Sequence, residues 1–525
     1  MKKIIKYLFL LTGGSFILAS CNDFLDREPL DSVTPDNFFF TENDLAAYAV
    51  KHYNFTTHEG FNAGIWKNDN ATDNQAATDY DKKWIPGQWK VPEAYDNPAS
   101  NDPWYFSTIR EANYFLETVV PRFEKGEIEG SETNIKHYIG EMYFLRAKNY
   151  LSKLETFGDF PIIKNTLPDE SESLIQASKR APRYKVAHFI LEDLDQAISL
   201  LTNNISGGKN RITKNAALLL KSRAALFEAS WLTYHKGTAL VPGGPGWPGK
   251  AEDIADFNID TEIAFFLKEA KAAAKEVIGN AALVQNTAKD CMDETVKTDE
   301  DKYKMSNPYF AQFSANSLEG YSEILMWRAY NLLDYKIVHS APFYIRVGGN
   351  TGFTRQYVES FLCRDGKPIY ATDQYKGDES LLNVRKNRDL RLQLFLMTPG
   401  ETLSPNVMNG TPDLLPEVPQ LLDITEKRCV TGYQVRKGLS GNWYRDGNTA
   451  IEGCPVYRAA EAYLNYIEAD CMEHNGTSIG SEAAGYWGDL RERAGLPRDY
   501  TVTVNNTDCL LYTSDTADDL IGVDL

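Results

Sequence analysis

The chain has 525 residues and a formal net charge of −18 at pH 7, from 55 Lys and Arg against 73 Asp and Glu. A surface this acidic repels phosphate backbones and anionic lipid headgroups, which argues against nucleic acid as a partner and against membrane attachment by basic patches. The length is ample for one large core or two domains. Aromatic residues make up 12% of the chain, which suits core packing or flat, weakly polar ligands such as sugars.

Residues 1–20 have the pattern of a lipoprotein signal peptide. A basic start precedes an apolar run from Tyr7 to Leu18, which is shorter than the roughly 20 apolar residues that a membrane span needs. Small residues then lead directly to Cys21, as a lipoprotein signal peptidase requires. We therefore expect the Cys21 thiol to carry a diacylglyceryl group and to tether the exported chain. An ordinary secretory signal that happens to contain a cysteine is the alternative.

Apolar residues recur at helical spacing through much of the chain, which predicts a mostly helical fold. The stripes are Tyr105, Ile109, Ala112, Leu116 and Val119; Phe144, Ala147, Leu151 and Leu154; Val186, Phe189, Ile190, Leu194, Ala197, Ile198 and Leu201; Phe266, Ala270, Ala273 and Val277; and Ala460, Leu464, Ile467 and Cys471. Beside the third stripe, we expect Glu192, Asp193 and Asp195 to face away from the core. The run 216–229 is apolar nearly all round and predicts a central helix. Helices in such succession indicate antiparallel pairs stacked on one another.

Long stretches without regular spacing separate these helices. They cover residues 54–103, 235–260 and 400–420 and are rich in Gly, Pro, Asn and aromatic residues. Loops of this length inside a compact protein are usually functional or disordered. Tryptophans in the first two stretches argue against disorder there.

Known catalytic and metal motifs are missing from the sequence. The glycine run before Lys250 lacks the Ser or Thr of a phosphate loop, and the seven histidines have no metal-ligand spacing, so we expect no cofactor and no metal. The six cysteines beyond Cys21 form no CxxC pair, which indicates buried free thiols or at most one bridge. The sequence contains too many acidic residues to identify the carboxylate pair of a glycoside hydrolase. The sequence motifs therefore do not exclude an enzyme.

Two tryptophan clusters have the composition of a sugar subsite. An indole can stack on the apolar face of a pyranose, while Asp, Asn or Arg side chains bind the hydroxyls at its edge. In one cluster Trp84 would be the platform, with Asp73 and Asn74 bonding sugar hydroxyls. In the other Trp327 would stack and Tyr335 would close an edge. For either tryptophan, packing in the core is the alternative.

The last residues, 509–525, resemble the translated adapter sequence that ends many truncated gene sequences, and we leave them out of the fold prediction. We therefore expect the fold to be truncated at its C-terminus. The helix expected around 485–494 would then lack a packing partner.

Several short motifs follow one another in a fixed order. They are Cys21-Asn22-Asp23-Phe24-Leu25-Asp26; the segment 104–117 with Ala112 and Asn113; Phe144-Leu145-Arg146-Ala147; Phe157-Gly158-Asp159-Phe160-Pro161; Ile190-Leu191-Glu192-Asp193-Leu194; Arg211-Ile212-Thr213-Lys214; Asp365-Gly366-Lys367-Pro368; Asn387-Arg388-Asp389; Thr431-Gly432-Tyr433; and the segments 455–469 and 491–497. This order, from residue 21 to about 500, resembles the SusD/RagB-like family of outer-membrane nutrient-binding lipoproteins.

The resemblance implies a SusD-like domain over residues 21–508, in which a scaffold of tetratricopeptide-like helical pairs carries a loop-rich variable region at about 235–455. It also implies a lipid-anchored protein on the outer face of the outer membrane, acting as a lid on a SusC-like TonB-dependent transporter. Family members bind glycans without cleaving them, so no catalytic residue is expected, and they place ligand contacts where the 54–103 loops meet the stretch after Ile324. Peptide capture on the same scaffold and a tethered glycoside hydrolase are the alternatives.

Overall fold

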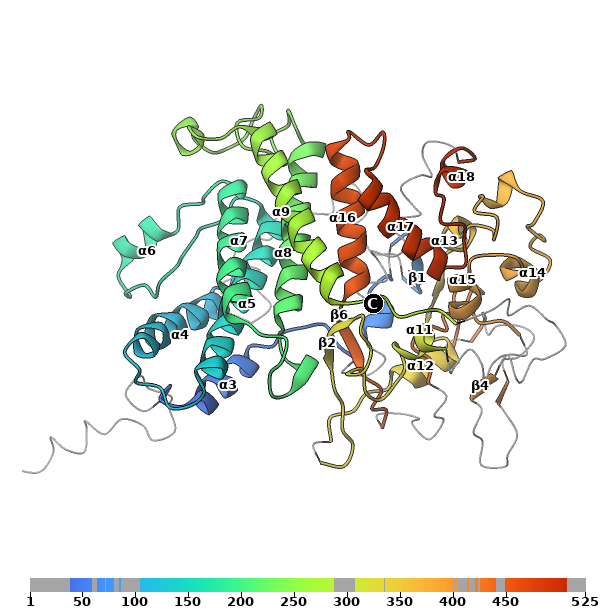
Figure 1. The fold of residues 1–525 in the computed structure, drawn as a ribbon, viewed down its shortest axis with the longest axis horizontal. Helices are drawn as coiled ribbons and strands as arrows, with labels where there is room; N and C mark the ends of the chain where they lie inside the picture. The colour runs from blue at the N-terminus through green and yellow to red at the C-terminus, as the bar shows by residue number, and fades with distance from the viewer. Residues whose placement is uncertain are drawn as a thin grey trace, which may run out of the picture.

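The computed structural model describes residues 38–58, 64–70, 72–79, 85, 104–287, 307–334, 336–399, 402–404, 413–414, 421–423, 425–440 and 449–507. Long helices stand side by side in one part of the molecule, and short elements joined by loops form the other (Figure 1). Cys21, Trp84, Tyr335 and residues 509–525 lie outside the described residues.

The long helices form an array in which neighbours along the chain are mostly neighbours in space. Its members are α3 (Glu42–Lys51), α4 (Ser107–Glu124), α5 (Glu132–Phe157), α7 (Arg183–Leu200), α8 (Lys214–Tyr234), α9 (Ile259–Asn280), α16 (Ala459–Glu473) and α17 (Ser481–Arg493). From α4 onward each helix contacts the next in this order, and α3 contacts α5. Such stacking of successive helices confirms the predicted succession of packed pairs.

Helix α8 is the central helix that the sequence predicts. It begins at the cap residue Thr213, whose Oγ1 accepts a hydrogen bond of 3.2 Å from the Ala216 amide. Its apolar side chains are buried on every face because α7, α9 and α16 all contact it. The expected stripes of α4, α5, α7, α9 and α16 are likewise buried, except that Tyr105 precedes α4 and that Ile198 and Cys471 are half-buried.

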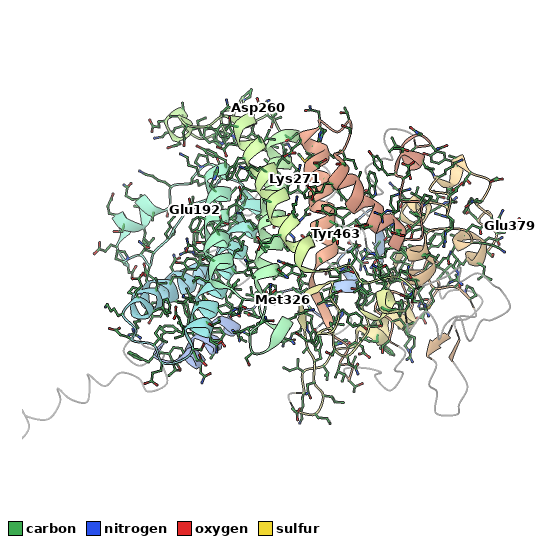
Figure 2. The ribbon with its side chains drawn as sticks, in the orientation of Figure 1. Glu192, Asp260, Lys271, Met326, Glu379 and Tyr463 are labelled. Carbon is green, nitrogen blue, oxygen red and sulfur yellow. The ribbon has the colours of Figure 1, made fainter. Side chains whose placement is uncertain are left out.

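Asp193 corrects one expectation for α7. Glu192 and Asp195 are exposed as predicted, and Figure 2 shows Glu192 on the outer side of the array. Asp193 is only 3% exposed, and both its carboxylate oxygens accept bonds of 2.7 Å from Arg146 on α5. The prediction was wrong for Asp193 because a cation on the neighbouring helix compensates its buried charge.

Ion pairs also join the last helices of the array. Lys271 on α9 (Figure 2) donates to Asp470 at 2.6 Å and to Glu473 at 2.7 Å, both on or next to the end of α16. Lys275, one turn further along α9, donates to Glu482 of α17 at 3.0 Å. Residues 459–493 therefore return to the helical array after a long excursion through the loop-rich part.

The loop-rich part contains short helices and three two-stranded sheets. Its helices are α11 (Pro308–Ala311), α12 (Ala341–Val347), α13 (Arg355–Ser360), α14 (Leu381–Arg385), α15 (Leu390–Phe395), α18 (Thr501–Val504) and the 3-10 turn η5 (Ile369–Ala371); elsewhere lie α6 (Ser171–Ala177), η1 (Ile65–Lys67), η3 (Gly208–Asn210) and η4 (Ala251–Ile254). Arg388 holds several of these segments together. It is fully buried and donates to the carbonyl oxygens of Val358, Phe361 and Val384.

The three sheets are antiparallel pairs. Two of them join segments that are far apart in sequence, and the third joins two segments about ten residues apart. They are β1 (Gln75–Ala77) with β3 (Thr351–Phe353), β2 (Ile324–Arg328) with β6 (Cys454–Arg458), and β4 (Thr402–Ser404) with β5 (Asp413–Leu414). The β2–β6 pair places Arg328 opposite Cys454 and leads directly into α16. It therefore fastens the loop-rich part to the array.

The C-terminal end differs from the expectation. Helix α17 packs on α16, and the Trp487 indole stacks on the Tyr500 ring at 4.8 Å between centroids. Thr503 donates to the Gly366 carbonyl oxygen at 2.6 Å. The expectation that this helix lacks a partner was wrong, because residues 498–507 fold back on it. The boundaries of the variable region at 235 and 455 stay a prediction, although α9 within it belongs to the array.

The described cysteines are free thiols. Cys363, Cys429 and Cys454 are buried and Cys471 is half-buried. This confirms the expectation of buried free thiols for the part of the chain that the structure describes. Burial raises the pKa of the Cys363 thiol to about 11, so that thiol stays protonated at neutral pH.

Candidate functional site

Residues 53–58 link the helical array to the loop-rich part. The Tyr53 hydroxyl donates to Glu141 Oε1 on α5 at 2.8 Å. Further along, the His58 amide donates to the Tyr330 hydroxyl at 2.9 Å, just after β2. The beginning of the 54–103 stretch therefore meets the stretch after Ile324, where the sequence analysis places the site.

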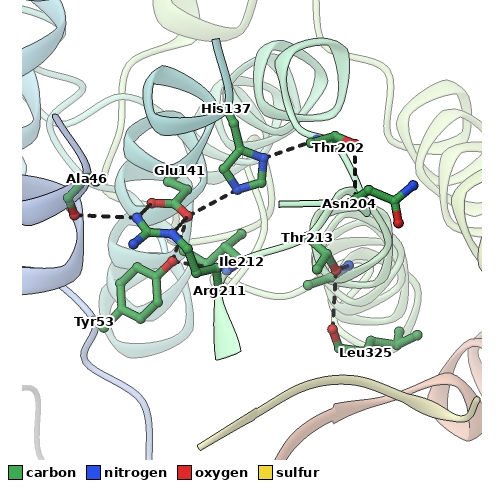
Figure 3. Close-up of polar contacts among 11 residues, drawn as sticks. Ala46, Tyr53, His137, Glu141, Thr202, Asn204, Arg211, Ile212, Thr213 and Leu325 are labelled. Carbon is green, nitrogen blue, oxygen red and sulfur yellow. Dashed lines mark hydrogen bonds and ion pairs between the residues drawn. The ribbon is translucent and has the colours of Figure 1, made fainter. Parts of the chain in front are cut away.

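A buried polar network fixes the start of this segment (Figure 3). Arg211 donates to both oxygens of Glu141, at 2.8 and 2.5 Å, and His137 Nε2 lies 3.2 Å from the same carboxylate. His137 Nδ1 accepts a hydrogen bond of 3.2 Å from the Thr202 amide. Burial and the charge of Glu141 raise the pKa of Tyr53 well above its usual value, which keeps its hydroxyl a donor.

A cleft of about 830 Å³ opens beside this segment. Its walls come from residues 54–56, 65, 68 and 69, from helices α5, α8 and α16, and from strand β6. The lining residues are Asn54, Phe55, Thr56, Ile65, Asn68, Asp69, Lys148, Arg223, Leu226, Phe227, Ser230, Pro455, Val456, Tyr457, Glu461, Asn465 and Glu468. Rings and polar side chains alternate on these walls, and the volume is in the range of small-molecule sites.

Two cations line the cleft and differ in their partners. Arg223 on α8 donates to both carboxylate oxygens of Glu461 on α16, at 2.5 and 2.8 Å, and lies 5.4 Å from the centre of the Tyr457 ring. Lys148 on α5 donates to the Asn54 carbonyl oxygen at 2.6 Å. Burial, and then the nearby charge of Arg223, lower the pKa of Lys148, while Glu155 acts in the opposite direction.

Helix α16 contributes two further polar groups. Asn465 is 2% exposed, and its amide nitrogen has no hydrogen-bond partner among the described residues. Glu468 is half-buried, and burial raises its pKa, which favours the protonated carboxyl. A buried amide without a partner is costly, so these groups are suited to bind the hydroxyls of a polar ligand.

The predicted residues Asp73 and Asn74 lie at a neighbouring sheet. Asp73 is exposed and Asn74 is buried, and the backbone carbonyl oxygens of both accept hydrogen bonds from Thr354 at the end of β3. Neither lines the cleft. Their role in sugar binding stays a prediction.

Trp327 is placed in the core. Its side chain packs against Leu318 and Ile324, is 5% exposed, and donates from Nε1 to Glu319 Oε2 at 3.1 Å. A sugar ring could stack on this indole only if the surrounding side chains moved, so the structure favours core packing over the stacking role. Trp84 and Tyr335, the other predicted aromatic contacts, lie outside the described residues.

The cleft residues Lys148, Arg223, Glu461 and Asn465 were not singled out from the sequence. A signal was nevertheless present for two of them. Arg223 lies inside the largely apolar run 216–229, which also contains Lys221, Ser222 and Glu228, and Glu461 lies among alanines at a helix start. A charge at such a position must find a partner or a ligand. The sequence does not show that these two charges face each other.

Two searches of the described residues complete the picture of the site. No group of three or more His, Cys, Asp or Glu side chains in this part of the chain could hold a metal ion. Among the described helices, none has the length and apolar character to cross a membrane.

Family models match both halves of the chain. The model described as "SusD family" matches residues 296–522, and the model described as "Starch-binding associating with outer membrane" matches residues 23–226. The chain belongs to the SusD/RagB-like family. The first of these matches extends into residues 509–525, which the sequence analysis set aside.

Curated relatives of this family member come from Formosa agariphila. SusD-like protein P38 is 27% identical over 203 residues, which is 38% of this chain and 37% of that protein. SusD-like protein P2 is 26% identical over 258 residues, 48% of this chain and 45% of that protein. The chain thus matches less than half the length of these relatives.

Solved structures show the same fold. A SusD-like protein from Bacteroides fragilis has a TM-score of 0.60 at 20% identity, over 95% of this chain and 85% of that one. A SusD-like carbohydrate binding protein from the same species has a TM-score of 0.58 at 16% identity, over 93% and 83%. A third, solved with xylogluco-oligosaccharide, has a TM-score of 0.50 at 16% identity, over 91% and 79%. The mostly helical SusD-like fold is therefore confirmed.

Proposed function

We propose that this SusD-like protein is a cell-surface lipoprotein that binds oligosaccharide and delivers it to a partner TonB-dependent transporter, without catalysis. The description of the N-terminal family model as starch-binding and outer-membrane-associating supports this proposal. So do the structural relatives described as carbohydrate binding or solved with an oligosaccharide. A peptide ligand on the same scaffold is the alternative.

The observation that carries the proposal is the cleft of about 830 Å³ with its mixed lining. Phe55, Phe227 and Tyr457 offer ring faces for the C–H groups of a pyranose. Asn465 and Asn68 offer amides for sugar hydroxyls, which need a hydrogen-bond partner once they leave water. This combination of ring faces and neutral polar groups fits a sugar chain.

Phe55→Ala tests the site. The side chain is half-buried in a segment without regular structure, so its removal should leave the array intact. Loss of a ring from a sugar subsite should weaken glycan binding by about 1 to 2 kcal/mol. Calorimetry with a panel of oligosaccharides measures the effect, and Tyr370→Ala, which removes a 55% exposed ring outside the cleft, is the matched control.

The result separates the candidate sites. Weaker binding in Phe55→Ala alone, at an unchanged melting temperature, supports the cleft. Unchanged affinity would move the ligand toward the predicted residues Asp73, Asn74, Trp84 and Tyr335. Reducing-end assays on the same mixtures address the hydrolase alternative, since release of new sugar ends by the purified protein would contradict a binding role.

Delivery to a transporter requires a complex in the membrane. We expect a TonB-dependent transporter encoded beside this gene to co-purify with the lipoprotein from detergent extracts. Carbohydrate-active enzymes in the same gene neighbourhood would favour a glycan ligand, whereas peptidases there would favour a peptide.

A further inference from the structure

Lys148 on α5 is a half-buried cation of the helical array. Its one hydrogen bond is to the Asn54 carbonyl oxygen, and it lies 5.1 Å from the centre of the Phe55 ring. No carboxylate of the described residues forms an ion pair with it. Lys148 is half-buried and lines the cleft, so part of its hydration is lost, and Glu155 acts on its charge without forming an ion pair with it.

Other cations of the array have carboxylate partners. These pairs are Arg146 with Asp193, Arg183 with Glu228, Arg211 with Glu141, Lys221 with Asp195 and Glu269, and Lys271 with Asp470 and Glu473. Within the cleft itself, Arg223 is neutralised by Glu461 through two hydrogen bonds. When a cation at a cleft of this size has no ion pair with a carboxylate of the protein, a bound ligand can supply the opposite charge.

The remaining acidic groups of the cleft do not take that place. Glu461 is committed to Arg223, and burial raises the pKa of Glu468. Asp69 also lines the cleft, from the turn after η1. Lys148 therefore brings to this cleft an ammonium group that donates to a backbone carbonyl oxygen, in a chain whose net charge is −18.

We infer that the cleft takes an acidic oligosaccharide, and that Lys148 binds the carboxylate of a uronic acid residue. This inference rests on the proposed function, because it names the class of glycan bound at the same site. A uronate carries its carboxylate directly on the pyranose ring, so a carboxylate at Lys148 brings the C–H face of that ring close to Phe55. The Asn465 amide nitrogen, which also lines the cleft and has no hydrogen-bond partner among the described residues, can then bind a hydroxyl of the same glycan.

The overall charge restricts this class further. An acidic protein repels a dense polyanion at long range, whereas one ion pair inside the cleft acts at short range and is screened less. We therefore expect a glycan in which one uronate lies between neutral sugars. Only the carboxylate at Lys148 would gain an ion pair, and any further carboxylate would face the acidic surface of the protein.

Paired ligands test the inference directly. The probes are short oligomers containing galacturonate, glucuronate or mannuronate, each as the free acid and as its methyl ester, which removes the charge and keeps the ring. At least one free acid should bind the wild-type protein about ten-fold more tightly than its ester, the size expected for a hydrogen bond to a charged group. Calorimetry measures both affinities.

Variants of Lys148 then show whether this residue causes the preference for the free acid. Lys148→Met should reduce the preference for the acid to within about two-fold, and Lys148→Arg should keep it, since the charge is retained. Lys136→Met is the control on the same helix, because Lys136 pairs with Glu132 outside the cleft. All variants are compared at unchanged melting temperature.

The following outcomes would overturn the inference. Equal affinity of the wild type for every acid and its ester would do so, as would a preference that survives in Lys148→Met. If neutral oligosaccharides bind and acids gain nothing, the proposed function stands and the acidic class alone fails. If no oligosaccharide binds, and glutamate-rich peptides bind through Lys148 instead, the proposed function fails together with the glycan class.

Discussion

Buried charged side chains in this protein form ion pairs between neighbouring helices. Arg146 on α5 pairs with Asp193 on α7, and Arg183 at the start of α7 pairs with Glu228 on α8 through bonds of 2.8 to 3.1 Å. Removing one member leaves the other buried without a counter-charge, which costs far more than a surface ion pair contributes. Such pairs fix which helix faces meet.

Asp193→Ala should therefore destabilise the protein strongly. We expect the free energy of unfolding to fall by about 3 to 5 kcal/mol, because Arg146 would stay buried without its carboxylate. Urea unfolding measures this loss. Glu192→Ala is the neighbouring control, since its carboxylate is exposed and pairs with Lys164 at the surface, and it should cost at most about 1 kcal/mol. Equal costs for the two variants would contradict the pairing argument.

A Trp327 variant distinguishes a role in the core from a role in ligand binding. Trp327→Ala should lower the free energy of unfolding by about 3 to 5 kcal/mol, because the indole fills space between Leu318, Ile324 and Gly453. Chemical unfolding checks this value. A variant with wild-type stability but weakened glycan binding would instead restore the stacking role that the sequence suggests.

At the scale of elements, Glu482 joins three helices. It lies in the first turn of α17 and accepts hydrogen bonds from Tyr466 of α16 at 2.8 Å, from Tyr486 at 2.9 Å, and from Lys275 of α9 at 3.0 Å. Hydrogen bonds from Lys275 and then the two tyrosines lower the pKa of this carboxyl from 4.5 to about 2. The ionised carboxylate of Glu482 therefore stabilises the folded helical array.

The pKa of Glu482 predicts a pH-dependent effect. Because the folded pKa lies below the unfolded one, its contribution to stability is complete above about pH 4.5 and is lost as the pH falls towards about 2. The difference in melting temperature between wild type and Glu482→Gln should be larger at pH 7 than at pH 3. Thermal melts at both pH values test this, with the exposed Glu127→Gln as control. A difference that grows on acidification would contradict the assignment.

For the whole molecule, the membrane anchor is expected at Cys21. The lipoprotein pattern of residues 1–21 predicts a covalent lipid at this position. Cys21→Ala should release the protein into the soluble fraction of cells that lack the partner transporter. Fractionation tests this, and an alanine variant that remained in the membrane pellet would show a different mode of attachment.

The sequence by itself determined the helical part of this protein. Apolar spacing located the buried faces of α4, α5, α7, α9 and α16, and the nearly uniform apolar run 216–229 identified α8 as central. These predictions succeed because helical periodicity is a local property, and the side that carries the apolar stripe must be buried whichever helix covers it.

Only the tertiary structure decided the partners of polar residues and the position of the cleft. Asp193 looks like a surface residue until α5 brings Arg146 against it, and Trp327 looks like a sugar platform until β2 carries it into the core. The cleft joins residues 54–69, Lys148, Arg223 and Glu461, which are hundreds of residues apart at the extremes. Local patterns do not encode such contacts, since they arise from the order in which the helices stack and from the β2–β6 pairing that returns the chain to α16.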